Sequence, residues 1–289
     1  MKRIIKKLTY SYKCKDNFDI VSLLSIVFFF LCNLKLLLVV VMNLDEYLMK
    51  ELNISKKEAY QISYAVNKYT KEKKKIKLNI KLPNYTVGEE IFNSISHGIG
   101  AIFSIVALIL MVVKAHGILP ETTVTLFGCA MIILYVMSCI YHALPPSLEG
   151  KKVLRVIDHC NVFLLVYGTY IPMSLVGVGG KSGLALFIAI TIITIIGVLL
   201  TAIKIDKTQV LQVICHLLSG WGALFFISQL KNSLGINGLI LLIIGGVMYS
   251  IGSLLYAIGR KRKYMHSIFH VFCLLGTLFH FLCVYLFLL

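Results

Sequence analysis

Acidic side chains are scarce in this sequence. Its 289 residues include 13 Asp and Glu against 29 Lys and Arg, which gives a formal net charge of +16. In a soluble protein such an excess would indicate nucleic-acid binding. Here hydrophobic residues make up 58% of the chain, and most basic residues lie between long apolar runs. Positive charge in that position sets membrane topology and faces anionic headgroups, so we expect membrane lipids, and no nucleic acid, as partners.

The sequence also lacks any CxxC pair, so its cysteines do not point to a zinc or redox motif. Most of the eight cysteines lie inside apolar runs. A thiol in such a run usually packs as a small hydrophobic side chain. We therefore expect structural cysteines.

Seven apolar segments follow one another from Ile95 to the C-terminus, and each is long enough to cross a hydrocarbon core of about 30 Å as a helix. Helices are required because unpaired backbone groups are too costly in lipid. The fold class predicted is all-α, a polytopic seven-transmembrane helix bundle. The segments are 95–113, 122–142, 156–176, 182–203, 208–230, 236–258 and 266–289.

The region before this core divides into two parts. Residues 1–43 form an N-terminal extension whose apolar stretch, 20–42, predicts an extra membrane-inserted helix; a signal-anchor, a cleaved leader and a start-site artefact are the alternatives. Residues 44–90 are polar and Lys-rich, including "KYTKEKKKIK", and predict a cytoplasmic segment. Residues 91–289 form the membrane domain.

Loop charges predict the orientation of the core. The loops after segments two, four and six carry nine basic residues, and those after segments one, three and five carry three. Basic loops stay in the cytoplasm. We therefore expect an integral protein of the plasma membrane or an organelle membrane, with the N-terminal end of the core cytoplasmic and the C-terminus on the opposite side.

Ionisable residues inside the apolar segments are few, and each is a functional candidate because it is costly in lipid. Segment two ends with "SCIYH", which places Ser138 and His142 at i and i+4. Segment three opens with "VIDHCN" and contains Asp158. Segment seven opens with "HSIFH", which places His266 and His270 at i and i+4.

The predicted topology brings these three motifs to the cytoplasmic leaflet. Spacing of i and i+4 puts both members of a pair on one helix face. His266 and His270 can then bind one ion, and His142 can supply a third nitrogen. Three His ligands and an open fourth position are the set of a catalytic zinc. Asp158 would act as base and Ser138 would orient water or a substrate carbonyl.

A simpler interpretation stands beside this one. A single HxxxH pair is a weak signal for metal, and a histidine near a basic loop can lie in the headgroup region. For three other histidines inside segments, His97, His216 and His280, structural roles are favoured, with His97 and His216 also candidates to support the site.

Four motifs together resemble the hemolysin III family, part of the wider group that contains the progestin and adipoQ receptors. They are "EEIFNSISHGIGA", "SCIYHALP", "RVIDHCNVFLLVYGTYIPMSL" and "HSIFHVFCLLGTLFHF", in order within about residues 88–289. The resemblance implies seven helices and zinc near the cytoplasmic leaflet. By motif, the family's zinc ligands map to His142, His266 and His270, and its Ser and Asp map to Ser138 and Asp158.

Three functions remain open at the level of sequence. The related alkaline ceramidases imply a zinc-dependent hydrolase that acts on a lipid amide or ester. The family name implies a cytolytic or pore-forming protein, although the segments show no continuous polar stripe to line a pore. A receptor or sensor with structural zinc is the third, disfavoured because the outer loops are too short to hold a large ligand.

Overall fold

The computed structural model divides the chain into two units, Met1–Lys77 and Leu78–Leu289. It describes residues 55, 57–58, 60–61, 64, 80–259 and 262–289. The predicted helix at 20–42 and most of the Lys-rich segment 44–90 lie outside the described residues. In the first unit, the Glu58 carboxylate accepts hydrogen bonds from the backbone and hydroxyl of Ser55.

The second unit consists of helices. Its described residues include seven α-helices, and one of these, α10, contains a backbone break. Their bounds are α5 Val87–Lys114, α6 Ile118–Ala143, α7 Glu149–Pro172, α8 Gly180–Lys204, α9 Gln209–Trp221, α10 Ile227–Gly259 and α11 Met265–Cys283. Two π-helical turns, η1 Met173–Val178 and η3 Val284–Leu288, extend α7 and α11, and a 3-10 turn, η2 Gly222–Phe226, joins α9 to α10.

Six helical stretches among the described residues are long and apolar enough to cross a membrane, in keeping with the predicted polytopic fold. Five of them coincide with single predicted segments. The sixth, Gln209–Gly259, covers the two segments 208–230 and 236–258 in one stretch of 51 residues. Its backbone leaves the helical region at Gly235 (φ 65°, ψ 179°), between the two predicted segments.

Two helices, α5 and α8, expose large aliphatic side chains and bury several small or polar ones. On α5, Ile95, Ile99 and Ile102 are exposed, while Gly100 and Ser104 are buried. Helix α8 likewise buries glycine and threonine, together with Leu186, Phe187 and Ile190, and exposes isoleucine and leucine. Small residues let membrane helices approach closely, and lipid covers the large aliphatic side chains. This pattern is that of an integral membrane protein.

The first helix begins earlier than the sequence predicted, at Val87 and not at Ile95. A capping box explains this start: Thr86 Oγ1 accepts from the backbone of Glu89, and the Glu89 carboxylate accepts from the backbone of Thr86. These bonds satisfy the free N–H groups of the first turn. The polar stretch before Ile95 is therefore part of the helix and faces its neighbours.

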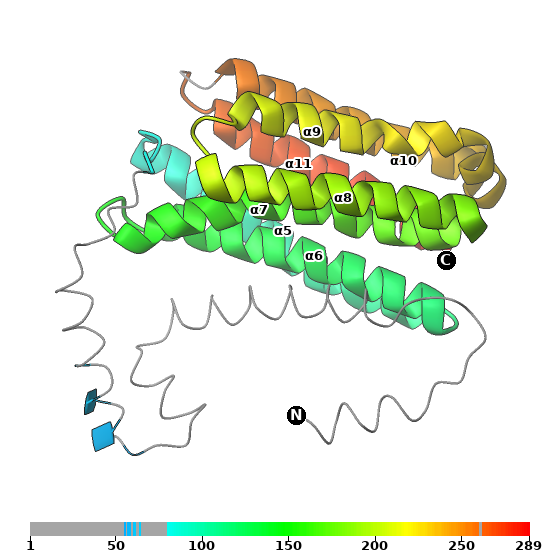
Figure 1. Ribbon diagram of the computed structural model, residues 1–289, viewed down its shortest axis with the longest axis horizontal. Helices are drawn as coiled ribbons and strands as arrows, with labels where there is room; N and C mark the ends of the chain where they lie inside the picture. Colours follow the sequence, from blue (N-terminus) through cyan, green and yellow to red (C-terminus); the bar gives the residue numbers. More distant parts are fainter. Residues whose placement is uncertain (1–54, 56, 59, 62–63, 65–79, 260–261) are drawn as a thin grey trace. The chain divides into compact units, whose positions relative to one another are not determined.

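Three helix ends meet on the same side of the bundle. The start of α5, the α6–α7 connection and the start of α11 all lie at the left in Figure 1, and α5 packs against both α6 and α11. Tyr264, just before α11, adopts a left-handed conformation (φ 63°) that few residues other than glycine favour. Its N–H donates to Glu89 Oε1 at 2.7 Å, which fixes the start of α11 beside α5.

Candidate metal centre

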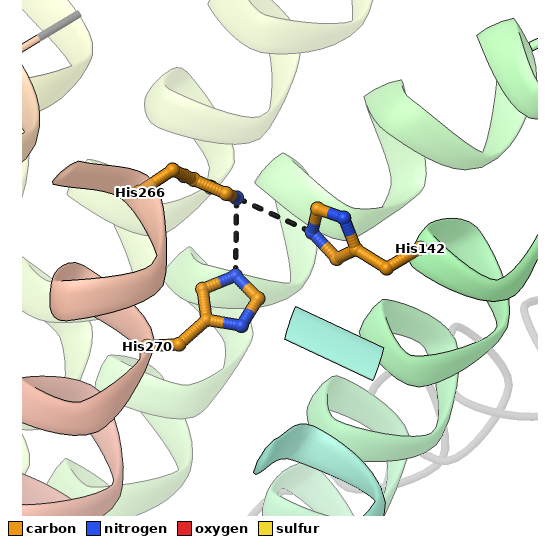
Figure 2. A group of neighbouring side chains, drawn as sticks. All are labelled: His142, His266 and His270. Carbon is orange, nitrogen blue, oxygen red and sulfur yellow. Dashed lines mark hydrogen bonds between the residues drawn. The ribbon is translucent and has the colours of Figure 1, made fainter. Parts of the chain in front are cut away.

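Three histidines from two distant helices converge at this end of the bundle. His142 lies in the last turn of α6, and His266 and His270 lie in the first two turns of α11. His266 Nε2 is 3.2 Å from His142 Nε2 and 3.0 Å from His270 Nε2. Figure 2 shows the three rings pointing toward a common point. The side chains are buried, at 2%, 8% and 1% relative exposure for His142, His266 and His270.

This cluster could hold a metal ion, because one nitrogen from each ring lies within 4.8 Å of the others. Ligands at ~2.0–2.1 Å around a tetrahedral zinc are separated by ~3.3 Å. This separation is close to the 3.2 and 3.0 Å between His266 Nε2 and the Nε2 atoms of His142 and His270. Hydrogen bonds alone fit less well. His266 Nε2 faces two other ring nitrogens but carries at most one hydrogen, so it can donate to only one of them. A cation satisfies all three lone pairs.

Aromatic rings restrict the orientation of the three histidines. Tyr85 stacks on His266 with ring centroids 5.1 Å apart, and His97 stacks on His270 at 3.6 Å. Tyr141 packs against His142 at 4.5 Å. Burial raises the pKa of the Tyr85 phenol well above its ordinary value, an effect increased by Tyr256 and Tyr141. Tyr85 therefore stays protonated beside the cluster.

Asp158 and Ser138, the two further site residues predicted from sequence, lie next to the cluster. Both are buried, and the Asp158 carboxylate interacts electrostatically with His142 and Ser138. Among the described residues, Ser138 Oγ has no partner within normal hydrogen-bond distance and geometry, so its contact with Asp158 is a longer one. One turn further along α7, Asn161 is also buried with both side-chain polar atoms unpaired among the described residues. The Asn161 amide is thus available to a bound molecule.

The three histidines for which structural roles were favoured have such contacts. His97 packs edge-on against Tyr135, with ring centroids 5.0 Å apart, besides stacking on His270. His216 of α9 stacks on Phe163 of α7 at 3.7 Å. His280 Nε2 lies 3.2 Å from the Leu242 carbonyl oxygen, one contact between α11 and α10.

Two residues beside His142 were missed by sequence reasoning. Glu90 Oε2 lies 2.6 Å from His142 Nδ1, and Glu90 Oε1 lies 2.6 Å from Lys151 Nζ. Glu90 belongs to the polar stretch that the sequence assigned to the tail, and Lys151 was counted as a topology residue in a loop. The available signals were an acidic residue directly before an apolar run and its place in the motif "EEIFNSISHGIGA".

A second ion pair, between the buried Arg155 and the partly exposed Asp206, lies close to the α8–α9 connection. Arg155 Nη1 donates to Asp206 Oδ1 at 2.7 Å and to the Lys81 carbonyl oxygen at 2.5 Å, while the Lys81 N–H donates to Asp206 Oδ2 at 3.2 Å. Burial alone would raise the pKa of Asp206, but these hydrogen bonds outweigh it and hold the pKa below its ordinary value. Lys151 and Arg155, counted for topology, are therefore also internal ion-pair partners.

The family model described as haemolysin-III related matches residues 85–281, which include all of the residues of this cluster. The chain belongs to the hemolysin III family. Hemolysin-3 of Bacillus cereus is 34% identical over 202 residues, which are 68% of this chain and 91% of that protein. A Hemolysin-3 homolog of Bacillus subtilis (strain 168) is 32% identical over 203 residues, 69% of this chain and 94% of that one.

No solved structure matches the chain. Family membership and the six apolar helices together identify an integral membrane protein. The hemolysin III match begins at residue 85, so Glu90 and the start of α5 belong to the shared region, whereas the N-terminal extension does not.

Proposed function

We propose that this hemolysin III protein is an intramembrane zinc hydrolase that cleaves a lipid amide or ester. The observation that carries the proposal is the convergence of three buried Nε2 atoms, two of the separations being 3.0 and 3.2 Å. An all-nitrogen set of three ligands with an open position favours zinc in a catalytic site. Zinc bound there supplies Lewis-acid polarisation of a substrate carbonyl.

The chain's own residues account for the remaining requirements of the reaction. His142, His266 and His270 hold the ion. The Asp158 carboxylate accepts the proton of the attacking water and returns it to the leaving group, and the Ser138 hydroxyl orients the substrate carbonyl. Burial of these side chains excludes bulk water, which strengthens each electrostatic interaction. A lipid substrate enters laterally between helices whose outer faces are aliphatic.

The proposed topology places the site at the cytoplasmic leaflet. A straight helix of 51 residues, as in Gln209–Gly259, is more than twice the ~30 Å hydrocarbon thickness at ~1.5 Å per residue. We propose that this stretch crosses twice and reverses at Gly235. The membrane then contains seven spans, with the basic loops and the N-terminal end of α5 on the cytoplasmic side and the C-terminus on the opposite side.

Metal analysis of detergent-purified protein tests the proposal. Wild type should contain one zinc per chain, and His142→Ala and His270→Ala should lose most of it. The same three preparations are given long-chain lipid amides and esters, and released fatty acid is measured by mass spectrometry. The proposal would be contradicted by purified wild-type protein that contains no zinc. It would also be contradicted if His270→Ala released fatty acid as fast as wild type.

Membrane lysis is the second candidate, because the two relatives carry the name Hemolysin-3. Residues exposed on the spanning helices are aliphatic, which disfavours a pore through a single chain but permits an oligomeric one. Dye release from liposomes with a sharp solute-size cutoff would support lysis. Leakage unchanged by chelators and by His142→Ala would separate it from zinc chemistry.

A further inference from the structure

Glu90 connects the metal-ligand candidate His142 to a buried lysine. Its Oε2 lies 2.6 Å from His142 Nδ1 and its Oε1 lies 2.6 Å from Lys151 Nζ. Lys151 Nζ also donates to the Leu144 carbonyl oxygen at 2.6 Å. Glu90 lies in the first turn of α5, His142 in the last turn of α6 and Lys151 in the first turn of α7. The bridge therefore joins three helices at the cluster.

The contact with Glu90 determines which nitrogen of His142 carries the hydrogen. In a neutral imidazole, one nitrogen donates and the other accepts. The 2.6 Å contact with a carboxylate oxygen requires the hydrogen on Nδ1. Nε2 is then left with a free lone pair, and Nε2 is the atom that faces His266 at 3.2 Å. Glu90 thus selects the tautomer that can bind a cation.

Glu90 is not placed to be a ligand itself. Its carboxylate lies on the Nδ1 side of the His142 ring, whereas the three converging atoms are all Nε2. The other polar neighbour of Nδ1, Asn93 Nδ2, is 3.5 Å away. That amide nitrogen is a donor only, so it cannot accept the Nδ1 hydrogen. Glu90 is the acceptor.

Lys151 holds the carboxylate in this orientation. Its side chain is only 2% exposed and that of Glu90 15%. A buried ammonium group is costly unless paired, and here it is matched by Glu90 Oε1, the Leu144 carbonyl oxygen and the Tyr141 ring, whose centroid is 5.2 Å away. With Oε1 engaged by Lys151, Oε2 remains directed at His142.

We propose that Glu90 and Lys151 form a positioning pair that prepares His142 to bind the metal ion. The inference rests on the metal site of the proposed function but not on hydrolysis. Loss of a hydrogen-bond partner of a ligating histidine typically weakens metal affinity by ~10–100-fold. The effect is thus measurable on affinity itself, without a substrate.

The neighbouring Glu89 provides a matched control. It is also buried and acidic, but its carboxylate accepts from Thr86 and from the backbone of Tyr264. In Glu89→Gln the amide oxygen can still accept from the Tyr264 N–H that fixes the start of α11, whereas the bonds from Thr86 are weakened. This variant should therefore lower thermal stability without changing zinc affinity. A purely structural role for Glu90 would make the two variants behave alike.

The experiment uses full-length protein in detergent, stripped of metal and titrated with zinc against a chromophoric chelator. Glu90→Gln should bind zinc ~10-fold more weakly and Glu90→Ala up to ~100-fold more weakly than wild type. Lys151→Met should weaken binding in the wild-type background but add little to Glu90→Ala, since Lys151 acts through Glu90. In Co²⁺-loaded protein, Glu90→Gln should shift the visible spectrum, whereas Glu89→Gln should not.

The possible failures are distinguishable. Wild type that binds zinc, with Glu90→Gln and Glu90→Ala binding it equally tightly, overturns the positioning pair and leaves the zinc site standing. Equal losses of affinity in Glu89→Gln and Glu90→Gln also overturn it. Wild type that binds no zinc overturns both this inference and the proposed function.

Discussion

The Nε2 atoms of His266 and His270 lie 3.0 Å apart, on the same face of α11 and one turn from each other. His142 Nε2 approaches His266 from a residue 124 positions earlier in the chain. Because the three atoms share one focus, removing any one ring leaves a two-nitrogen site. Such a site lacks the three protein ligands usual for zinc.

We therefore expect His266→Ala to lose bound zinc as His142→Ala and His270→Ala do. His280→Ala is the matched control, since His280 also lies on α11 but contacts the Leu242 carbonyl oxygen. Metal content measured by mass spectrometry after size-exclusion chromatography decides between them. Equal zinc in His266→Ala and wild type would contradict the three-histidine site.

Asp158→Asn should abolish hydrolysis while leaving zinc in place. The amide is nearly isosteric with the carboxylate but cannot accept a proton, and a general base typically contributes ~10²–10⁴-fold to the rate. The rate of release of fatty acid from the lipid substrate, measured beside zinc content, checks this. An unchanged rate in Asp158→Asn would show that Asp158 is not the general base. Loss of both zinc and activity would instead indicate that Asp158 helps to bind the ion.

Asp206 should make the stability of the protein sensitive to acid. Its pKa is lowered in the folded protein by Arg155 and Lys81, despite the opposing effect of burial. A lowered pKa contributes stability above the unfolded value of ~3.9, and that contribution is lost as the pH falls through the folded value. Asp206→Asn should therefore be less thermostable than wild type at neutral pH, and the difference should close below pH ~4.

Melting temperatures in detergent across this pH range measure the effect. Asp206 is about one-third exposed, so solvent screening will keep the difference modest. The reverse trend, a gap that widens toward acid pH, would show that the ion pair does not stabilise the fold.

Gly168→Ala should destabilise the contact between α6 and α7. A methyl group added at Gly168 would lie 2.5 Å from the Ala130 Cβ, well inside the ~3.5–4.0 Å of a normal carbon contact. Neither atom is on a flexible side chain, so the helices must separate, at a cost of ~1–3 kcal/mol. At Gly220 of α9 an added methyl group meets nothing within 4 Å, so Gly220→Ala should leave the melting temperature unchanged or raise it.

The class of fold was predictable from sequence because few backbone structures can span a lipid bilayer. Apolar runs of span length must form helices in a bilayer, and the runs at 122–142, 182–203 and 266–289 became α6, α8 and α11 with η3. Spacing of i and i+4 also placed His266 and His270 on one helix face. These local properties depend on neighbouring residues in the chain.

Segment boundaries were less well determined where polar residues face the interior. The start of α5 was placed too late because Glu89, Glu90 and Asn93 lower hydropathy although they pack against other helices. Hydropathy averages over all faces of a helix and cannot show which side chain has a buried partner. By contrast, the backbone break at Gly235 in Gln209–Gly259 lies between the two predicted segments, 208–230 and 236–258.

The sequence by itself therefore determined a helical membrane protein with one histidine pair, His266 and His270, at a helix end, because hydropathy and helical periodicity are local. Only the tertiary structure decided that His142 lies within 3.2 Å of His266, and that Glu90 and Lys151 support it from two further helices. These contacts depend on how the helices pack against one another. Packing is set by small residues such as Gly168 and by buried charges whose partners lie far away in the chain.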